Sequence, residues 1–158
     1  MLKDAFFLSE AMRYNVKGRK YIGANSKYYF ADVGLRNARL NFRQLEATHL
    51  MENVIYNELL VRGFNVDVGI VEVNAKQNGK NVKLQLEVDF VATLGNKKLY
   101  VQSAYRMDDT EKQNQEMASL RKIDDSFAKI IVVRDNVKPH QNEDGFMIIG
   151  LKDFLLQE

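Results

Sequence analysis

The spacing of apolar residues divides the chain into helical and extended segments. The clearest helical pattern lies at 48–62, where apolar residues recur every three or four positions and form one stripe. The stripe consists of Met51, Val54, Ile55 and Leu59, with Arg62 in the last turn. Thr48 is a candidate N-cap, and Gly63 is of the type that ends helices. The pattern predicts one long amphipathic helix.

Alternation of apolar and polar residues predicts a strand at 82–93. On this pattern Leu84, Leu86, Val88 and Phe90 face one way, whereas Gln85, Glu87 and Asp89 face the other. Turn-forming residues flank the segment, with Asn78-Gly79 before it and Leu94-Gly95-Asn96-Lys97 after it. The middle of the chain is therefore expected to contain antiparallel hairpins.

The remaining patterns complete the predicted order of elements. Helices are expected at 2–12, 34–42, 108–122 and 151–156, and further strands at 14–16, 28–33, 66–73, 98–105, 127–134 and 146–149. From residue 48 the order is helix, three strands, helix, two strands, helix. This order predicts an α/β fold with a mixed β-sheet flanked by helices.

Composition limits the class of protein. A chain of 158 residues with a single proline and scattered glycines suits one globular domain with at most a small appendage. It has no cysteine, which excludes disulfides and thiolate zinc sites. The longest apolar run, around 129–133, is strand-sized, and the N-terminus lacks the features of a signal peptide. We expect a cytoplasmic protein that does not enter a membrane.

The net charge of +2 does not decide whether the partner is nucleic acid, but its distribution is uneven. Between residues 12 and 30 five cationic side chains and four tyrosines occur without an acid. Such a mixture suits phosphate contacts and base stacking. A solvated hairpin with its tyrosines packed inward explains the same residues and is the favoured interpretation.

Three side chains have the spacing of a metal-dependent phosphodiesterase site. Hydrolysis of a phosphodiester needs carboxylates around Mg²⁺ or Mn²⁺ and a cation near the attacked phosphate. Glu52 lies in the predicted long helix, Asp89 on the polar face of a strand, and Gln102 on the next strand, where it shares a face with Ala104. Glu87 is a candidate extra ligand, and Arg106 a candidate cation.

The series Glu52, Gly63-Phe64, Asp89 and Gln102-Ser103-Ala104 resembles the PD-(D/E)xK nuclease superfamily, especially its Holliday-junction-resolvase-like branch. The resemblance implies a restriction-endonuclease-like fold in which Glu52 and Asp89 would hold the metal. Gln102 stands where the family has its second acid, and Ala104 where it has its lysine. Glutamine brings no negative charge, and arginine at 106 does not exchange protons as lysine does. The resemblance therefore implies a vestigial site and weak or absent cleavage.

Three longer segments resemble a family of bacterial and archaeal AAA+ ATPases. They are 27–37 (KYYFADVGLRN), 49–60 (HLMENVIYNELL) and 87–91 (EVDFV). In that family these motifs lie in a C-terminal domain of unknown function that follows an ATPase and a winged-helix part. The chain differs from a full-length ATPase of this family because it has no Gly-x-x-x-x-Gly-Lys-[Ser/Thr] loop. We therefore expect residues 1–45 to be a helix/hairpin junction and 46–158 to be the nuclease-like domain.

The candidate residues also have plain structural explanations. An acid at 52, in the first turn of a helix, is favoured by the helix dipole alone. Gln102 is commonly a hydrogen-bonding strand residue, and Glu58 is expected to pair with Arg62 one turn later. Three functions stay open: an ATPase accessory domain that binds DNA or a partner without cleavage, a weak Mg²⁺- or Mn²⁺-dependent DNA endonuclease, and a protein-interaction or dimerisation module.

Overall fold

The computed structural model describes residues 7–23, 25–43, 46–77, 79–105 and 110–157. Its strands are β1 (Leu8–Ala11), β2 (Arg13–Asn15), β3 (Lys20–Tyr21), β4 (Lys27–Phe30), β5 (Asn65–Gln77), β6 (Lys80–Leu94), β7 (Lys97–Ala104), β8 (Ala128–Val133), β9 (His140–Gln141) and β10 (Met147–Gly150). Its helices are α1 (Val33–Arg39), α2 (Ala47–Val61), α3 (Thr110–Arg121) and α4 (Leu151–Leu156).

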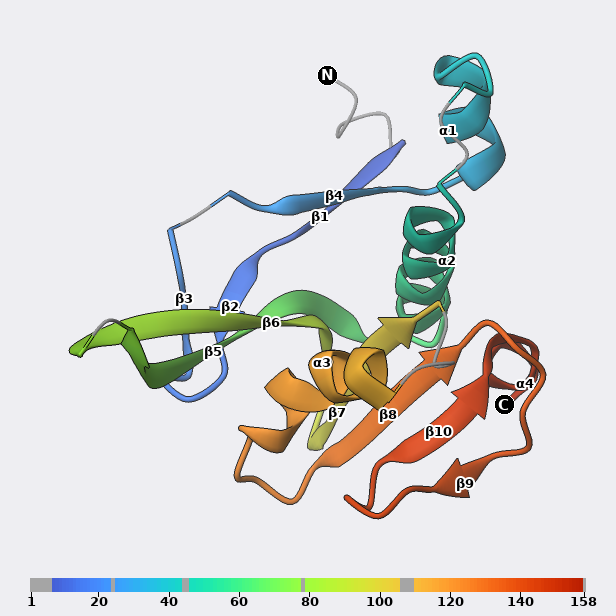
Figure 1. Cartoon of the computed structure of the whole chain (residues 1–158). Helices are drawn as coiled ribbons and strands as arrows, with labels where there is room; N and C mark the ends of the chain where they lie inside the picture. Colours follow the sequence, from blue (N-terminus) through green and yellow to red (C-terminus); the bar gives the residue numbers. More distant parts are fainter. Residues whose placement is uncertain (1–6, 24, 44–45, 78, 106–109, 158) are drawn as a thin grey trace.

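A mixed sheet forms the centre of the molecule (Figure 1). Over the described residues its strand order is β3-β2-β5-β6-β7-β8-β10-β9, and β1 and β4 form a separate antiparallel pair. The strands β5, β6 and β7 form an antiparallel meander, after which α3 leads to β8, which runs parallel to β7. The expected α/β architecture with a mixed sheet flanked by helices is confirmed.

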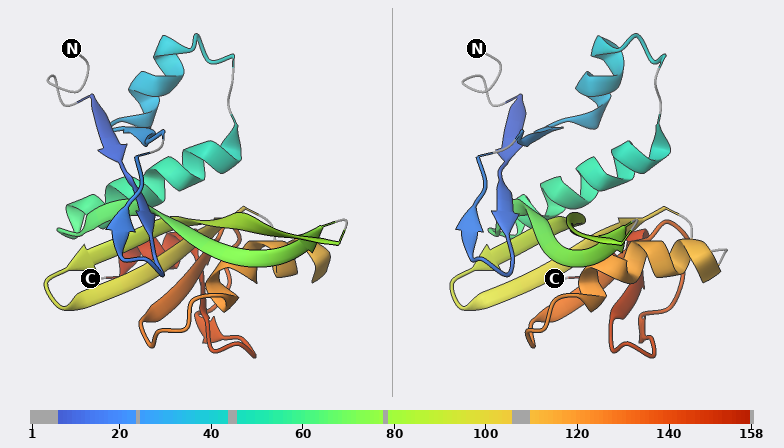
Figure 2. Two further views of the ribbon diagram at one scale, coloured as in Figure 1. Left: turned by 90° about the vertical axis from the view of Figure 1, so that its left-hand side faces the viewer. Right: turned by 60° about the vertical axis from the view of Figure 1, so that its left-hand side comes forward.

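Two apolar clusters cover the two faces of the sheet. On one face, Ile55 and Leu59 of α2 and Phe154 of α4 pack with strand residues and with the β1–β4 pair. On the other face, Met117 and Leu120 of α3 provide the cover. Figure 2 shows α2 and α3 on opposite sides of the sheet. The molecule is therefore built as layers around one sheet.

A β-bulge interrupts the pairing of β5 with β6. Asp67 is paired with Val91 and Gly69 with Val88, so that two β6 residues, Asp89 and Phe90, lie opposite one β5 residue. Phe90 consequently packs in the α2-side cluster, whereas Val88 belongs to the α3-side cluster. The predicted clean alternation, with Val88 and Phe90 on one face, is wrong here. A Cβ on Gly69 would lie 2.8 Å from Val91 Cγ2, so glycine permits this close approach.

The long helix differs from its prediction at its start and agrees at its end. It begins at Ala47 and its N-cap is Glu46, which makes no side-chain capping bond, so Thr48 is not the cap. Gly63 takes a φ of +84°, which glycine adopts without strain, and Phe64 N donates to Leu59 O at 3.1 Å. The predicted end of the helix is confirmed.

The N-terminal region contains strands where a helix was expected. Residues 8–11 of the predicted helix 2–12 form β1, which pairs with β4, and residues 2–6 lie outside the described residues. In this pairing the backbone groups of β1 find hydrogen-bond partners on β4. A short helix at this position would lose those partners. The following strand, β2, joins the main sheet beside β5. None of the helices among the described residues is long and apolar enough to cross a bilayer.

Candidate carboxylate site

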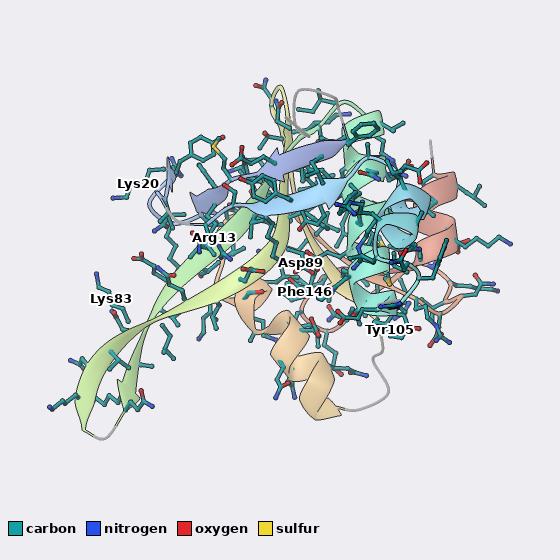
Figure 3. The ribbon with its side chains drawn as sticks, turned by 90° about the horizontal axis from the view of Figure 1, so that it is seen from above. Arg13, Lys20, Lys83, Asp89, Tyr105 and Phe146 are labelled. Carbon is teal, nitrogen blue, oxygen red and sulfur yellow. The ribbon has the colours of Figure 1, made fainter. Side chains whose placement is uncertain are left out.

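The candidate site lies where β6 and β7 separate. The two strands pair between the turn and the pair Phe90–Val101. On the other side of that pair they separate, and β6 stays beside β5 while β7 stays beside β8. Asp89 is the first β6 residue beyond this pairing. Its side chain is therefore at a fork in the sheet, between α2 on one face and α3 on the other (Figure 3).

Asp89 is a buried acid held by the backbone of β7. It is 9% exposed, and its Oδ2 accepts a hydrogen bond from Ser103 N at 2.8 Å. Burial and the negative charge of Glu52 together raise the pKa of Asp89 to about 7, against the lowering effects of the Ser103 bond and of Lys27. Glu116 of α3 acts in the same direction. Near neutral pH this carboxyl is thus partly protonated.

Glu52 is the acceptor for two groups of β4. Its Oε1 lies 2.6 Å from Tyr29 Oη and 2.9 Å from Lys27 Nζ. The Tyr29 ring is buried and stacks on Tyr56, with ring centroids 4.1 Å apart. Burial and the charge of Glu52 raise the pKa of Tyr29 far above its ordinary value, so Tyr29 is a fixed hydrogen-bond donor. The polar end of this tyrosine therefore anchors Glu52.

Lys27 joins the two glutamates at this site. Its Nζ lies 2.9 Å from Glu52 Oε1 and 2.7 Å from Glu87 Oε1, and Arg13 approaches the other oxygen of Glu87 at 2.8 Å. Burial lowers the pKa of Lys27, but the charge of Glu52 and the bond to Glu87 outweigh it and raise the pKa overall. Burial raises the pKa of Glu87, but the hydrogen bonds and positive charges of Lys27 and Arg13 together outweigh burial and lower the pKa overall. Lys27 and Glu87 are therefore both charged at neutral pH.

The side chain of Gln102 contacts the backbone N–H of Asp89 and not the Asp89 carboxylate. Its Oε1 accepts from Asp89 N at 3.3 Å, and its Nε2 donates to Glu116 Oε2 on α3 at 3.2 Å. The predicted shared face of Gln102 and Ala104 is confirmed, since Ala104 belongs to the α3-side cluster. The side chain of Gln102 therefore connects β6 to α3 and faces away from Glu52.

The predicted residues are thus only partly brought together. Glu52 and Asp89 lie close enough to affect each other's charge, whereas Gln102 points to α3. Because α2 begins at Ala47, Glu52 is beyond its first turn, and the dipole explanation does not account for it. Among the described residues no three His, Cys, Asp or Glu side chains are grouped closely enough to hold a metal ion. Arg106 lies outside the described residues.

Sequence reasoning missed three partners of the carboxylates. Lys27 and Tyr29 are 23 to 25 residues away from Glu52 in the chain, and Arg13 is 74 residues away from Glu87. Lys27 and Tyr29 did belong to the basic and aromatic stretch and to segment 27–37. The available signal was therefore a lysine and a tyrosine on alternate positions of a strand, without an indication of which acid they meet.

Comparison with known proteins gives one informative similarity. No protein-family model matches the chain. The chain is similar to an uncharacterised protein of Haemophilus influenzae, with 32% identity over 158 residues, which are 99% of this chain. The alignment covers 35% of the Haemophilus protein. The chain therefore spans about a third of the length of this curated relative.

Proposed function

We propose that this chain is a nuclease-like accessory domain of a larger, cytoplasmic ATPase, and that it binds its partner without cleaving nucleic acid. The order α2, β5–β6–β7 meander, α3 and parallel β8 supports a restriction-endonuclease-like fold. In such a fold an acid on the helix and an acid on the middle strand meet beside the sheet. Glu52 and Asp89 occupy those two places.

The observation that carries the absence of cleavage is the position of Lys27. Its ammonium is bound between Glu52 and Glu87, at the side of the site where a divalent cation would need carboxylate oxygens. A tethered cation neutralises these acids without the loss of freedom that a free ion undergoes on binding. Mg²⁺ or Mn²⁺ would have to displace it and would meet no acid at position 102.

The state of Asp89 points the same way. A carboxyl group must be deprotonated to bind a metal ion well, but burial and Glu52 keep this carboxyl partly protonated near neutral pH. Gln102 Oε1 is engaged by Asp89 N, and position 104 has no cation to assist a nucleophile. Each of these features weakens one requirement of metal-assisted hydrolysis.

The ATPase context rests on the three segments at 27–37, 49–60 and 87–91. The first segment contains Lys27 and Tyr29, the second contains Glu52, and the third contains Glu87 and Asp89. Each segment that carries the resemblance therefore contributes side chains to this site. The Haemophilus relative is about three times as long as the matched region, which agrees with a domain that acts within a longer protein.

Metal binding and cleavage assays test the proposal. Wild-type protein is incubated with supercoiled and branched DNA and Mn²⁺, and its melting temperature is measured with and without the ion. We expect no cleavage of the DNA and no change in the melting temperature on adding Mn²⁺. Lys27→Ala is the informative comparison, because it leaves the carboxylates without their cation. Mn²⁺ should then raise its melting temperature, and adding Glu52→Gln should remove that effect.

Cleavage by the wild-type protein would contradict the proposal if it is lost in both Glu52→Gln and Asp89→Asn. Such a result would establish the metal-dependent endonuclease in its place. The glutamine and asparagine variants are matched in size to the parent residues, so loss of the fold is easily separated from loss of the site by circular dichroism.

A further inference from the structure

The β5–β6 hairpin continues well beyond the main sheet. β2 pairs with β5 only as far as Ile70, and β7 pairs with β6 only from Phe90 onward. From the pair Val71–Leu86 to the pair Gln77–Lys80, β5 and β6 therefore have only each other as strand partners among the described residues. At about 3.4 Å per residue this ribbon is roughly 20 Å long. It projects as an arm in Figures 1 and 2.

The ribbon has one apolar and one polar face. On the apolar face Val73 and Leu86 pack against the α3-side cluster. The opposite face, given by the cross-strand pairs, consists of Glu72, Asn74, Lys76, Asn81, Lys83 and Gln85. All of these except Glu72 are exposed. The polar face therefore presents lysine and carboxamide side chains to solvent along the length of the arm.

A second group of cations lies beside this face. Lys17 and Lys20 are exposed in and next to the β2–β3 turn. A hollow of about 490 Å³ separates this turn from the ribbon and is lined by Lys17 and Lys20 on one side and Asn74 and Lys83 on the other. Figure 3 shows Lys20 and Lys83 at the side from which the ribbon projects.

The charge of this surface is mostly positive, although Glu72 lies on the polar face and also lines the hollow. The chain has three lysines and no acid between residues 73 and 86, and no acid between residues 12 and 30. Within the described ranges, no ion pair involves the exposed cations of this surface. They are Lys17, Lys20, Lys76 and Lys83. This arrangement attracts a polyanion.

We infer that the ribbon binds duplex DNA by placing its polar face in the major groove. That groove admits a two-stranded β-ribbon, lysine bonds to the acceptors of guanine, and asparagine or glutamine bonds to the edge of adenine. Lys17 and Lys20 would contact the phosphates at the side of the groove and fix the register. The inference deepens the binding role proposed above and rests on it, and it uses none of the residues of the carboxylate site.

The shape of the ribbon selects duplex DNA over duplex RNA. The major groove of an A-form RNA helix is too deep and narrow for side chains to read, so a ribbon that works by groove insertion should discriminate between the two. A surface that only attracts phosphates should bind both equally.

Fluorescence anisotropy with the full chain and a labelled mixed-sequence DNA duplex tests the inference. Lys76→Ala/Lys83→Ala is compared with Lys138→Ala/Lys152→Ala, which removes the same charge from exposed positions outside the ribbon and the β2–β3 turn. We expect the ribbon variant to bind about tenfold more weakly and with a smaller salt dependence. The control variant should stay within about twofold of wild type, and a duplex RNA of the same sequence should bind more weakly than the DNA.

The inference would be overturned in two ways, by the absence of DNA binding or by binding that is non-specific. Wild-type protein that does not bind duplex DNA at low salt would show that the arm serves another partner, such as a protein. Equal losses in the ribbon and control variants, or equal binding of the DNA and RNA duplexes, would show non-specific attraction. Neither result depends on Mn²⁺, so failure of the ribbon is distinguished from failure of the proposal on cleavage.

Discussion

Asp89 and Lys27 show how single side chains determine the character of the carboxylate site. Asp89 is held by Ser103 N inside the sheet, where burial opposes its ionisation. Lys27 lies in a more solvated place and is held between two acids, with its side chain 28% exposed. The same cluster thus contains an acid that tends to be neutral and a base that stays charged. Both conditions oppose the binding of a divalent cation.

The raised pKa of Asp89 gives a testable dependence of stability on pH. An unfolded aspartate has a pKa near 3.8, so between that value and about 7 the folded protein holds the proton more tightly than the unfolded chain. Wild-type stability should therefore fall as the pH rises through this range and level off above it. Asp89→Asn keeps an acceptor for Ser103 N and removes the ionisation. It should be more stable than wild type by about 1–3 kcal/mol at pH 8.

Urea unfolding of both proteins from pH 5 to pH 8 measures this effect. The advantage of Asp89→Asn should narrow as the pH falls, because wild-type Asp89 then takes up its proton. The pKa of Asp67 is also raised by burial, but Asp67 is present in both proteins and its contribution cancels. Parallel stability curves over the whole range would show that Asp89 is ionised without cost.

At the scale of elements, side chains of α2 hold the edge of β4 that is not paired with β1. Asn53 is 4% exposed, and its Oδ1 accepts from Phe30 N at 2.9 Å while its Nδ2 donates to Phe30 O at 2.7 Å. Asn57 adds a bond to Phe30 O at 3.0 Å. One amide side chain thus satisfies both backbone groups of a strand residue. The position of β4, and with it that of Lys27 and Tyr29, depends on this clamp.

Asn53→Ala should therefore destabilise the protein strongly for a polar substitution. It leaves two poorly solvated backbone groups of Phe30 without this partner, which costs about 2–3 kcal/mol. Asn57→Ala is the matched control, because Asn57 is half-buried and donates to the same Phe30 O that Asn53 already bonds. Its cost should be below about 1 kcal/mol. Chemical denaturation compares the two variants. Equal losses would show that the clamp at Phe30 is not the main contribution of Asn53.

At the scale of the whole molecule, the described part of the first 45 residues shares the core of the remainder. Val68 N donates to Met12 O at 2.9 Å, and Arg13 pairs with Val68 in the parallel β2–β5 ladder. Ala11 and Tyr29 are buried in the same cluster as α2. The described part of the expected junction segment therefore contributes strands and core side chains to the sheet on which the carboxylate site is built.

A fragment of residues 46–158 should consequently fail to fold cooperatively by itself. This fragment lacks β2 and β4. Without them the edge of β5 would be exposed, and so would the rings of Tyr56 and Phe90. Tyr29 of β4 covers these two rings, with centroids 4.1 Å and 5.7 Å away. Dispersion of amide resonances and thermal unfolding, compared with those of the full chain, measure the outcome. A well-dispersed spectrum and an unchanged melting temperature would establish 46–158 as an independent domain.

The sequence by itself determined the features that depend on neighbouring residues. The two-residue turn at Gly95-Asn96, the end of α2 at Gly63 and the Glu58–Arg62 ion pair at 2.8 Å were all predictable. The order of elements from α2 to α4 was predicted except for the short strand β9, which pairs with β10. Each follows from backbone conformations or side-chain spacings within one or two turns. Glu52 and Asp89 were likewise identified from their places on a helix and a strand.

The tertiary structure alone decided which distant groups meet. The bulge at Asp89–Phe90 arises from the pairing of β6 with β5, and alternation along one strand contains no information about an extra residue in that pairing. Residues 8–11 became a strand because β4 was available as a partner. Lys27 reached Glu52 and Glu87 only because α2 holds β4 above the fork of the sheet. Long-range pairing and burial, which local patterns do not encode, thus turned a recognisable pair of acids into a neutralised site.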